Sequence, residues 1–274
     1  MQKNKEKIIV IFGPTAAGKS AIAVRLAKKF GGEVISADSR QVYKGLDIGT
    51  EKITKKEMSG IPHHLIDIVS PRKAFTAADF KKRAENSVRY IVQNGNVPIV
   101  VGGTGFYIDT LLGKEILPSV PPNALLRREL EKKDTDDLYK ILKKKDPKRA
   151  KTIDRKNRRR LIRALEVIEV LGAVPQRVQK ESSYTVLKIG VTLDDKTLRA
   201  KIDKRLMNTL KKGLVSETKK LRKLSLSWKR IDELGLEYRI VGQYLRGELN
   251  RDEMEERLKQ KVWQYAKRQK TWLK

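Results

Sequence analysis

The stretch IIVIFGPTAAGKSAIAVRLA, residues 8–27, predicts a strand, a glycine-rich loop and a helix in immediate succession. Its first residues form a β-branched run without polar alternation, which is typical of a parallel strand buried on both faces. Its last residues carry apolar side chains at helical spacing. Between them, Gly13, Gly18, Lys19 and Ser20 satisfy the pattern G-x-x-x-x-G-K-[ST], with the strand and helix that this pattern requires on either side. The chain therefore contains a phosphate-binding loop.

Such a loop recognises an anion and does not by itself identify the molecule that carries it. Backbone N–H groups and a helix N-terminus surround the phosphate, Lys19 adds a positive charge, and the Ser20 hydroxyl can bind Mg²⁺. We therefore expect Mg²⁺ as a cofactor, with Ser20 as its ligand. The residues expected around the phosphate are those of the whole loop: Gly13, Pro14, Thr15, Ala16, Ala17, Gly18, Lys19 and Ser20.

Two further segments near the N-terminus predict strands that end in turns, GEVISADS at 32–39 and NVPIVVGGTG at 96–105. Between them, FTAADFKKRAENSVRYIVQNG at 75–95 predicts a helix with Thr76 as its N-cap and Asp79 three residues further on. This alternation of strands and helices predicts an α/β fold, namely a P-loop-type doubly wound parallel sheet.

The prolines of LLGKEILPSVPPN, residues 111–123, mark a change to lysine-rich segments with leucines at helical spacing. The next predicted strand is YTVLKIGVTL at 184–193. Three segments after it again predict helices: 195–224, 230–247 and 251–274.

From this pattern we expect a core made of residues 1–113 and 184–274, with a helical insertion lobe at 114–183. Apolar side chains at helical spacing in the last segment are expected to form a core stripe. They are Met254, Leu258, Val262 and Tyr265.

The composition makes a polyanion the expected partner. Lys and Arg number 62 against 33 Asp and Glu, and the formal net charge of +29 exceeds what a small anion requires. The mean hydropathy of −0.54 and the absence of an apolar run of about 18 residues argue against a membrane span. The N-terminus has no apolar secretory stretch, and the chain has no cysteine. We expect a cytoplasmic monomer without disulfides or a cysteine-bound metal.

Which strand carries a carboxylate at its end helps to distinguish the reactions that a phosphate-binding loop can serve. Kinases and NTPases with such a loop usually place a metal-binding aspartate at the end of another buried strand. Here that strand ends in VVGGTG, which offers Thr104 and glycines. Asp38, in ISADSRQVY, instead lies at the C-terminal end of the strand predicted within 32–39, at the edge where α/β sheets bind ligands. Asp38 is therefore the candidate catalytic residue, and capping of the turn is the open alternative.

The adjacent histidines His63 and His64 also invite a catalytic or metal-binding interpretation. Neighbouring side chains point in different directions, and no matching cluster of ligand residues lies near them in the sequence. We therefore expect both histidines to be structural.

Six blocks, in order over nearly the whole chain, resemble the tRNA dimethylallyltransferase family, bacterial type. They are GPTAAGKS, SADSRQVYKGLDIGT, IPHHLIDIV, VGGTGFYIDTLL, RRRLIRALEV and KRQKTWLK. The resemblance implies transfer of a dimethylallyl group from dimethylallyl diphosphate to N6 of the adenosine 3′ of the anticodon in tRNA. The phosphate held by the loop would then belong to a leaving group.

The resemblance also implies roles for individual residues. Asp38 resembles the family's general base, and Arg205, in IDKRLMNTLKKG, would join Lys19 at the departing diphosphate. Thr104 resembles a residue near the target base, which residues 39–41 would follow into the site. By residue type alone, an exposed charge for Arg205 and a strand-end hydrogen bond for Thr104 remain open. The candidate catalytic residues are Asp38, Lys19, Thr104 and Arg205.

Basic helices would hold the RNA on both sides of an extruded base. Arg159 and Arg163 lie four residues apart in RKNRRRLIRALE, and KRQKTWLK places basic residues beside Trp272, so that phosphate contact and stacking combine. A solvated face is the alternative for either run alone, but the net charge favours RNA binding. The resemblance adds Arg127 and thereby involves the insertion lobe in tRNA binding. The candidate tRNA contacts are Asp38, Ser39, Arg40, Gln41, Thr104, Arg127, Arg159, Arg163, Lys267, Arg268 and Trp272.

Two other functions remain open on the residues alone. A P-loop kinase of a small metabolite fits the same loop and could use Asp38 as a base, but it leaves the net charge unexplained. A non-enzymatic RNA-binding NTP switch would bind ATP at the loop and show nucleotide-dependent RNA affinity.

Overall fold

The computed structural model describes residues 5–115, 117–175 and 181–273. The chain divides into two compact units, which we call the core unit (Met1–Lys114 and Glu181–Lys274) and the insertion unit (Glu115–Lys180). The expected insertion at 114–183 differs from this division by one residue at its start and three at its end.

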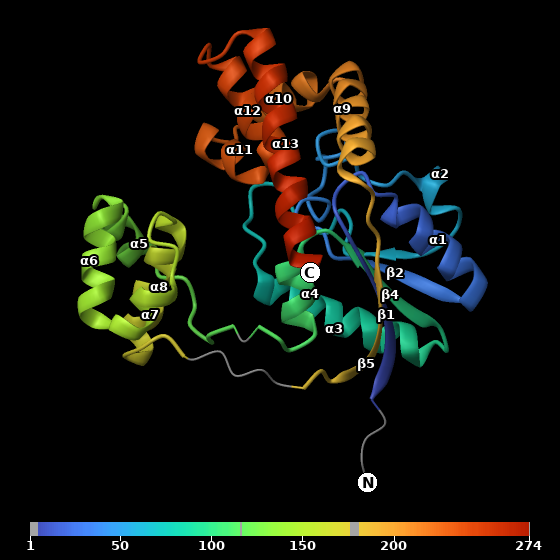
Figure 1. Ribbon diagram of the computed structural model, residues 1–274, viewed down its shortest axis with the longest axis horizontal. Coiled ribbons are helices and arrows are strands. Elements are labelled where there is room, and N and C mark those ends of the chain that lie inside the picture. The colour runs from blue at the N-terminus through green and yellow to red at the C-terminus, as the bar shows by residue number, and fades with distance from the viewer. Residues whose placement is uncertain (1–4, 116, 176–180, 274) are drawn as a thin grey trace. The chain divides into compact units, whose positions relative to one another are not determined.

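A parallel five-stranded sheet forms the centre of the core unit, in the order β3-β2-β4-β1-β5 (Figure 1). The parallel sheet was predicted, but the two-residue strand β3 was not, because two polar residues show no apolar periodicity. The strands are β1 (Glu6–Phe12), β2 (Gly32–Ser36), β3 (His63–His64), β4 (Val97–Gly102) and β5 (Tyr184–Gly190).

Helices cover both faces of this sheet, as the doubly wound prediction requires. Val34 of β2 packs against Ala27 of α1 (Lys19–Phe30), whereas the next residue, Ile35, packs in the cluster that contains Phe80 of α3 (Ala77–Gln93). This opposite packing follows from the alternation of side chains along a strand. Thr76 and Asp79 form a reciprocal capping box at the start of α3, which confirms that prediction. Two short helices complete this region, α2 (Lys55–Met58) and α4 (Gly105–Leu111).

The C-terminal part of the core unit is helical, with breaks that the pattern did not predict. Gly213, at φ +105°, interrupts the segment at 195–224, because a left-handed backbone favours glycine. Met254 and Leu258 are fully buried as expected, but Tyr265 is 39% exposed, so its assignment to the core stripe was wrong. The helices are α9 (Asp195–Lys211), α10 (Leu214–Lys223), α11 (Trp228–Leu234), α12 (Leu236–Leu245) and α13 (Arg251–Leu273).

The insertion unit has a hydrophobic core of its own. Leu138, Leu142, Leu161 and Leu165 pack in one buried cluster, as the leucine spacing predicted. Its described residues form helices, as expected: α5 (Ala124–Leu130), α6 (Thr135–Lys145), α7 (Pro147–Thr152) and α8 (Arg158–Leu171). In neither unit do the described helices combine the length and apolar character that crossing a membrane needs.

A buried carboxylate joins two helices of the insertion unit. Glu166 on α8 is 1% exposed and accepts hydrogen bonds from Nε and Nη2 of Arg127 on α5, both at 2.7 Å. It also accepts from the Asn123 backbone N–H at 2.9 Å, and Nη1 of Arg163 lies 3.4 Å away. Because these contacts lower the cost of burying the Glu166 charge, they stabilise the packing of α5 on α8.

Glu166→Gln is expected to destabilise the insertion unit. The amide offers one acceptor oxygen, so the bidentate contact with Arg127 is lost, at a cost of roughly 1.5–3 kcal/mol. Native-state hydrogen exchange of the full chain should show this loss in α5 and α8, and none in β1 or β4. Glu129→Gln, at an exposed position on α5, serves as the control. Unchanged protection of α5 and α8 in Glu166→Gln would contradict the stabilising role.

Candidate active site

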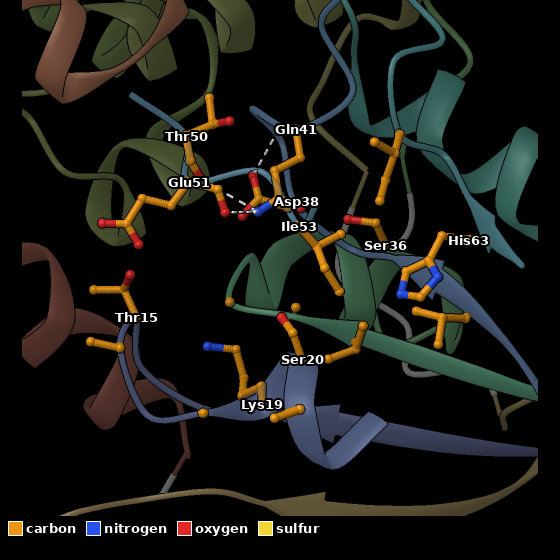
Figure 2. A pocket seen from close by; sticks show the side chains of 18 of the residues that line it. Thr15, Lys19, Ser20, Ser36, Asp38, Gln41, Thr50, Glu51, Ile53 and His63 are labelled. Atoms are coloured by element: carbon orange, nitrogen blue, oxygen red, sulfur yellow. Dashed lines mark hydrogen bonds between the residues drawn. The ribbon is translucent and has the colours of Figure 1, made fainter. Parts of the chain in front are cut away.

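A cavity of about 330 Å³ opens in the core unit at the carboxyl ends of the central strands. It brings together the phosphate-binding loop, the end of β2, the end of β4, and side chains from α9 and α13. Figure 2 shows Lys19 and Ser20 on one side of this cavity and Asp38 on the other. The predicted site residues that line it are Thr15, Ala16, Gly18, Lys19, Ser20, Asp38, Gln41 and Arg205.

The glycines of the loop are required by its backbone path. At Gly13 a Cβ atom would lie 2.2 Å from the Val191 carbonyl oxygen, so no side chain fits there. Gly18 has φ +89° and directly precedes α1, so the chain turns sharply into the helix. The N-terminal N–H groups of α1 therefore face the cavity, which suits an anion.

Two cationic side chains meet at the loop. Lys19 Nζ donates a hydrogen bond to the Pro14 carbonyl oxygen at 2.6 Å. Burial lowers the pKa of Lys19 from 10.5 to about 8, against the opposing effect of the Asp38 carboxylate. Arg205 on α9 donates from Nη1 to Thr15 Oγ1 at 2.7 Å and forms an ion pair with Glu51. Arg205 is therefore a part of the cavity wall and not an exposed helix charge.

Asp38 both caps a turn and faces the cavity. Its Oδ1 accepts hydrogen bonds from the backbone N–H groups of Arg40, at 2.7 Å, and Gln41, at 3.2 Å. The capping alternative is thus observed, but both bonds use one oxygen and the residue still lines the cavity. Thr104 Oγ1 accepts from the Ser39 N–H at 3.3 Å, which joins the ends of β2 and β4.

The loop that follows Asp38 is held from inside by its own side chains. Gln41 Nε2 lies 3.3 Å from the carbonyl oxygens of Thr50 and Glu51, and Arg40 Nη1 donates to the Glu233 carbonyl at 2.8 Å. These contacts place Glu51 beside Arg205. The side chains of Arg40 and Gln41, predicted to contact tRNA, therefore have partners within the protein.

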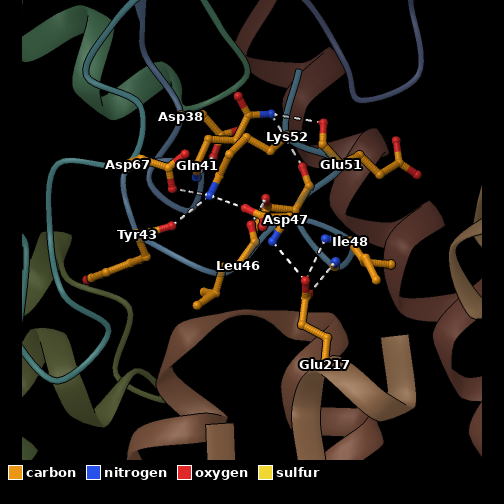
Figure 3. A network of polar contacts seen from close by, with 12 residues as sticks. Asp38, Gln41, Tyr43, Leu46, Asp47, Ile48, Glu51, Lys52, Asp67 and Glu217 are labelled. Atoms are coloured by element: carbon orange, nitrogen blue, oxygen red, sulfur yellow. Dashed lines mark hydrogen bonds and ion pairs between the residues drawn. The ribbon is translucent and has the colours of Figure 1, made fainter. Parts of the chain in front are cut away.

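A buried carboxylate on α10 holds the same loop from outside (Figure 3). Glu217 accepts hydrogen bonds from the N–H groups of Asp47, Ile48 and Gly49 at 2.8–2.9 Å. It also accepts from the Tyr238 hydroxyl at 2.7 Å. Four donors satisfy one buried carboxylate, so the loop has a defined position against α10.

A buried lysine completes this network. The side chain of Lys52 is 6% exposed and forms ion pairs with Asp47 and Asp67. Its Nζ also donates to the Tyr43 carbonyl at 2.8 Å. Neither Lys52 nor Glu217 was identified from the sequence. The backbone partners of Glu217 lie about 170 residues away, and the partners of Lys52 lie in loops that follow no periodic pattern.

Two residues of α13 line the cavity and were also missed. Although Tyr265 is 39% exposed as a whole, its hydroxyl lies near Thr104 and Asp38. There burial and the Asp38 charge raise the pKa of the hydroxyl to about 12, and a hydrogen bond with Thr104 opposes this shift. Gln269, one helical turn later, reaches the phosphate-binding loop. Their spacing of four residues predicts a common helix face, but the sequence did not distinguish this face from a core stripe.

The histidines have different environments. His64 Nε2 lies 2.6 Å from a carboxylate oxygen of Glu33, which fits the structural role that was predicted. His63 Nδ1 lies 2.8 Å from the Ile61 carbonyl oxygen, and the ring lines the cavity. Burial lowers the pKa of His63, which favours the neutral ring.

The IPP transferase family model matches residues 41–274. This chain belongs to the IPP transferase family. The tRNA dimethylallyltransferase of Anoxybacillus flavithermus is 41% identical over 98% of this chain and 88% of its own length. The tRNA dimethylallyltransferase 2 of Treponema denticola is 40% identical over 99% of this chain and 92% of its own length. Membership confirms the family resemblance and does not support the small-metabolite kinase.

Solved structures of IPP transferases show a similar fold. The tRNA isopentenylpyrophosphate transferase of Bacillus halodurans has a TM-score of 0.72 and 40% identity, over 98% of this chain and 87% of its own. A eukaryotic dimethylallyltransferase acting on tRNA has a TM-score of 0.82 and 31% identity, over 98% of this chain and 70% of its own. The P-loop-type α/β fold predicted from the sequence is thereby confirmed.

The predicted tRNA contacts of this IPP transferase lie in both units and stay predictions. In the insertion unit, Arg127 and Arg163 pair with Glu166, and Arg163 Nη2 also donates to the Val120 carbonyl at 2.7 Å. Arg159 is exposed on the same helix as Arg163.

On α13, Lys267 and Arg268 are exposed and lie over the rings of Trp263 and Tyr265, respectively. Trp272 is half-buried: its Nε1 donates to Asp109 Oδ2 at 2.6 Å, and its ring meets the ring of Phe12 edge-on at 5.3 Å. The Trp272 indole N–H is therefore already in use within the core unit.

The pKa of Lys19 predicts a pH dependence of anion binding. Lys19 is charged below about pH 8 and loses its charge above that pH. Above about pH 8, the Lys19 amine must therefore take up a proton when an anion binds beside it. Affinity for inorganic pyrophosphate should fall by up to about tenfold per pH unit above pH 8, relative to Lys19→Arg, which stays charged. Calorimetric titration of wild type and Lys19→Arg with pyrophosphate and Mg²⁺ measures the ratio of the two affinities at each pH. Parallel pH profiles for the two proteins would refute the assignment of this pH dependence to Lys19.

Proposed function

We propose that the protein transfers the dimethylallyl group of dimethylallyl diphosphate to N6 of the adenosine 3′ of the anticodon in tRNA. Membership in the IPP transferase family supports this reaction class. The central observation is that Lys19, a cation that can bind a diphosphate, and Asp38, a carboxylate that can accept a proton, line one cavity from opposite sides. A leaving group and a nucleophile can therefore meet between them.

The phosphate-binding loop stabilises the leaving group. Breaking the allylic C–O bond leaves negative charge on the diphosphate and spreads positive charge over the dimethylallyl carbons. Lys19, Arg205 and the N–H groups at the start of α1 are donors at the cavity in which that negative charge would develop. Because these donors are fixed before the reaction, little reorganisation opposes bond breaking.

Mg²⁺ fits the residues present as a partner of the diphosphate. The Ser20 hydroxyl lines the same cavity as Ser36 and Asp38, and these oxygen donors suit a hard cation. The described ranges contain no cluster of three or more His, Cys, Asp or Glu residues that could hold a metal. This agrees with Mg²⁺, which is commonly bound by few protein groups together with substrate phosphates and water. Bound there, Mg²⁺ would neutralise charge on the diphosphate.

Asp38 acts as the general base in this proposal. Its Oδ1 is fixed by the turn, so Oδ2 is the oxygen presented to the adenine amine. As the N6–C bond forms and the C–O bond breaks, the N6 proton passes to Asp38 and the diphosphate leaves with the bonding electrons. Proton removal of this kind contributes typically 10²–10⁴-fold.

The target base must leave its stack in the anticodon loop to reach this cavity. Ser39 directly follows Asp38 and its N–H donates to Thr104 Oγ1, and Tyr265, which lines the cavity, offers an aromatic face. The net charge of +29, with exposed basic residues on α8 of the insertion unit and on α13 of the core unit, supports binding of the tRNA backbone. We further propose that the protein acts as a monomer in the cytoplasm, where its tRNA substrate is found.

The decisive assay supplies Mg²⁺, labelled dimethylallyl diphosphate and an anticodon stem-loop with adenosine 3′ of the anticodon. Label should enter the RNA with wild-type protein and fall by about 10²–10⁴-fold with Asp38→Asn, which keeps the Oδ1 acceptor but not the base. Asp252→Asn, at an exposed position on α13, should react like wild type. Unlabelled RNA together with ATP consumption in a parallel reaction would instead support a kinase or an NTP switch.

A further inference from the structure

We propose that Gln269 is a positioning residue that orders the phosphate-binding loop from the C-terminal helix. The inference rests on the proposed function and concerns the same diphosphate site. Gln269 belongs to α13, whose basic residues were predicted from the sequence to contact tRNA. Its side chain instead points into the core unit and is 9% exposed.

Both ends of the Gln269 amide are used, and each reaches a different part of the site. Oε1 accepts a hydrogen bond from the Thr15 backbone N–H at 2.8 Å. Nε2 donates to the Gly103 carbonyl oxygen at 2.9 Å. Exchange of the two amide atoms would set N–H against N–H and oxygen against oxygen, so the orientation is determined. One side chain therefore joins the phosphate-binding loop to the turn that carries Thr104.

This contact changes the role of Thr15. Its N–H was expected to surround the phosphate, but it donates to Gln269 instead. Its hydroxyl accepts from Arg205, so Thr15 is held from α13 and from α9 at once. Thr15 is thus a point at which the loop is fixed. The loop residues that follow it and line the cavity are Ala16, Gly18, Lys19 and Ser20.

The fit of α13 on the turn at 103–105 leaves no room for side chains. A Cβ at Gly103 would lie 2.2 Å from Gln269 Nε2, and one at Gly105 would lie 2.3 Å from the Trp272 ring. Trp272 also donates to Asp109. The end of α13 is therefore packed directly on the active-site turns, and the exposed Lys267 and Arg268 lie on the same helix end.

Gln269→Met and Gln269→Asn test the proposal. The first keeps the volume and removes both hydrogen bonds; the second keeps an amide that is one methylene too short to bridge the two partners. We expect affinity for inorganic pyrophosphate with Mg²⁺ to fall by about tenfold, from loss of hydrogen bonds that order the loop. The KM for dimethylallyl diphosphate should rise by a similar factor, with the KM for RNA unchanged within about twofold.

Asp109→Ala is the matched control, because it removes the acceptor of the Trp272 indole N–H and so weakens the attachment of α13 without touching Thr15. It should leave pyrophosphate affinity within about twofold of wild type. Equal or tighter pyrophosphate binding by folded Gln269→Met and Gln269→Asn would overturn the proposal, as would equal losses in all three variants. Because pyrophosphate binding needs no prenyl transfer, an inactive wild-type protein would refute the proposed function and leave this test intact.

Discussion

The carboxylate of Glu217 is the interaction on which the geometry of the site most depends. The segment from Asp38 to Glu51 supplies the proposed base, the ion-pair partner of Arg205 and one wall of the cavity, yet it contains no regular secondary structure between β2 and α2. Such a segment needs partners for its backbone N–H groups. Glu217 satisfies three of them at once, and the cost of burying its charge is met by these bonds and by Tyr238.

The site therefore depends on the C-terminal helices as much as on the sheet. A phosphate-binding loop alone holds an anion and leaves the reaction undetermined. What distinguishes this chain is the carboxylate that follows β2, together with Arg205 from α9 and the aromatic and amide groups of α13. The helix α13, whose basic residues the charge pattern assigned to RNA, also lines the small-molecule cavity, so both substrates of the proposed reaction would meet on it.

Local signals predicted the sheet, the phosphate-binding loop and the Thr76 capping box, because the residues that determine each of them are neighbours in the sequence. Asp38 and Lys19 were predicted for the same reason, since Asp38 comes just after a recognisable strand and Lys19 begins a recognisable helix. Gln269 and Glu217 were not, because their partners are about 170 to 250 residues away in the chain. Arg127 illustrates the opposite failure: the family resemblance identified the residue, but the sequence could not reveal its bidentate contact with the buried Glu166.

Gly49 lies directly against the ring of Tyr238, and a Cβ atom at this position would approach the ring to 2.6 Å. The smallest side chain at Gly49 would push the loop away from α12 and from its acceptor on α10. A larger residue in the loop therefore requires a smaller one on the helix, so these distant positions can change only together. Anyone who exchanges the C-terminal helices between relatives, or redesigns the loop for a different prenyl donor, must treat both segments as a single unit.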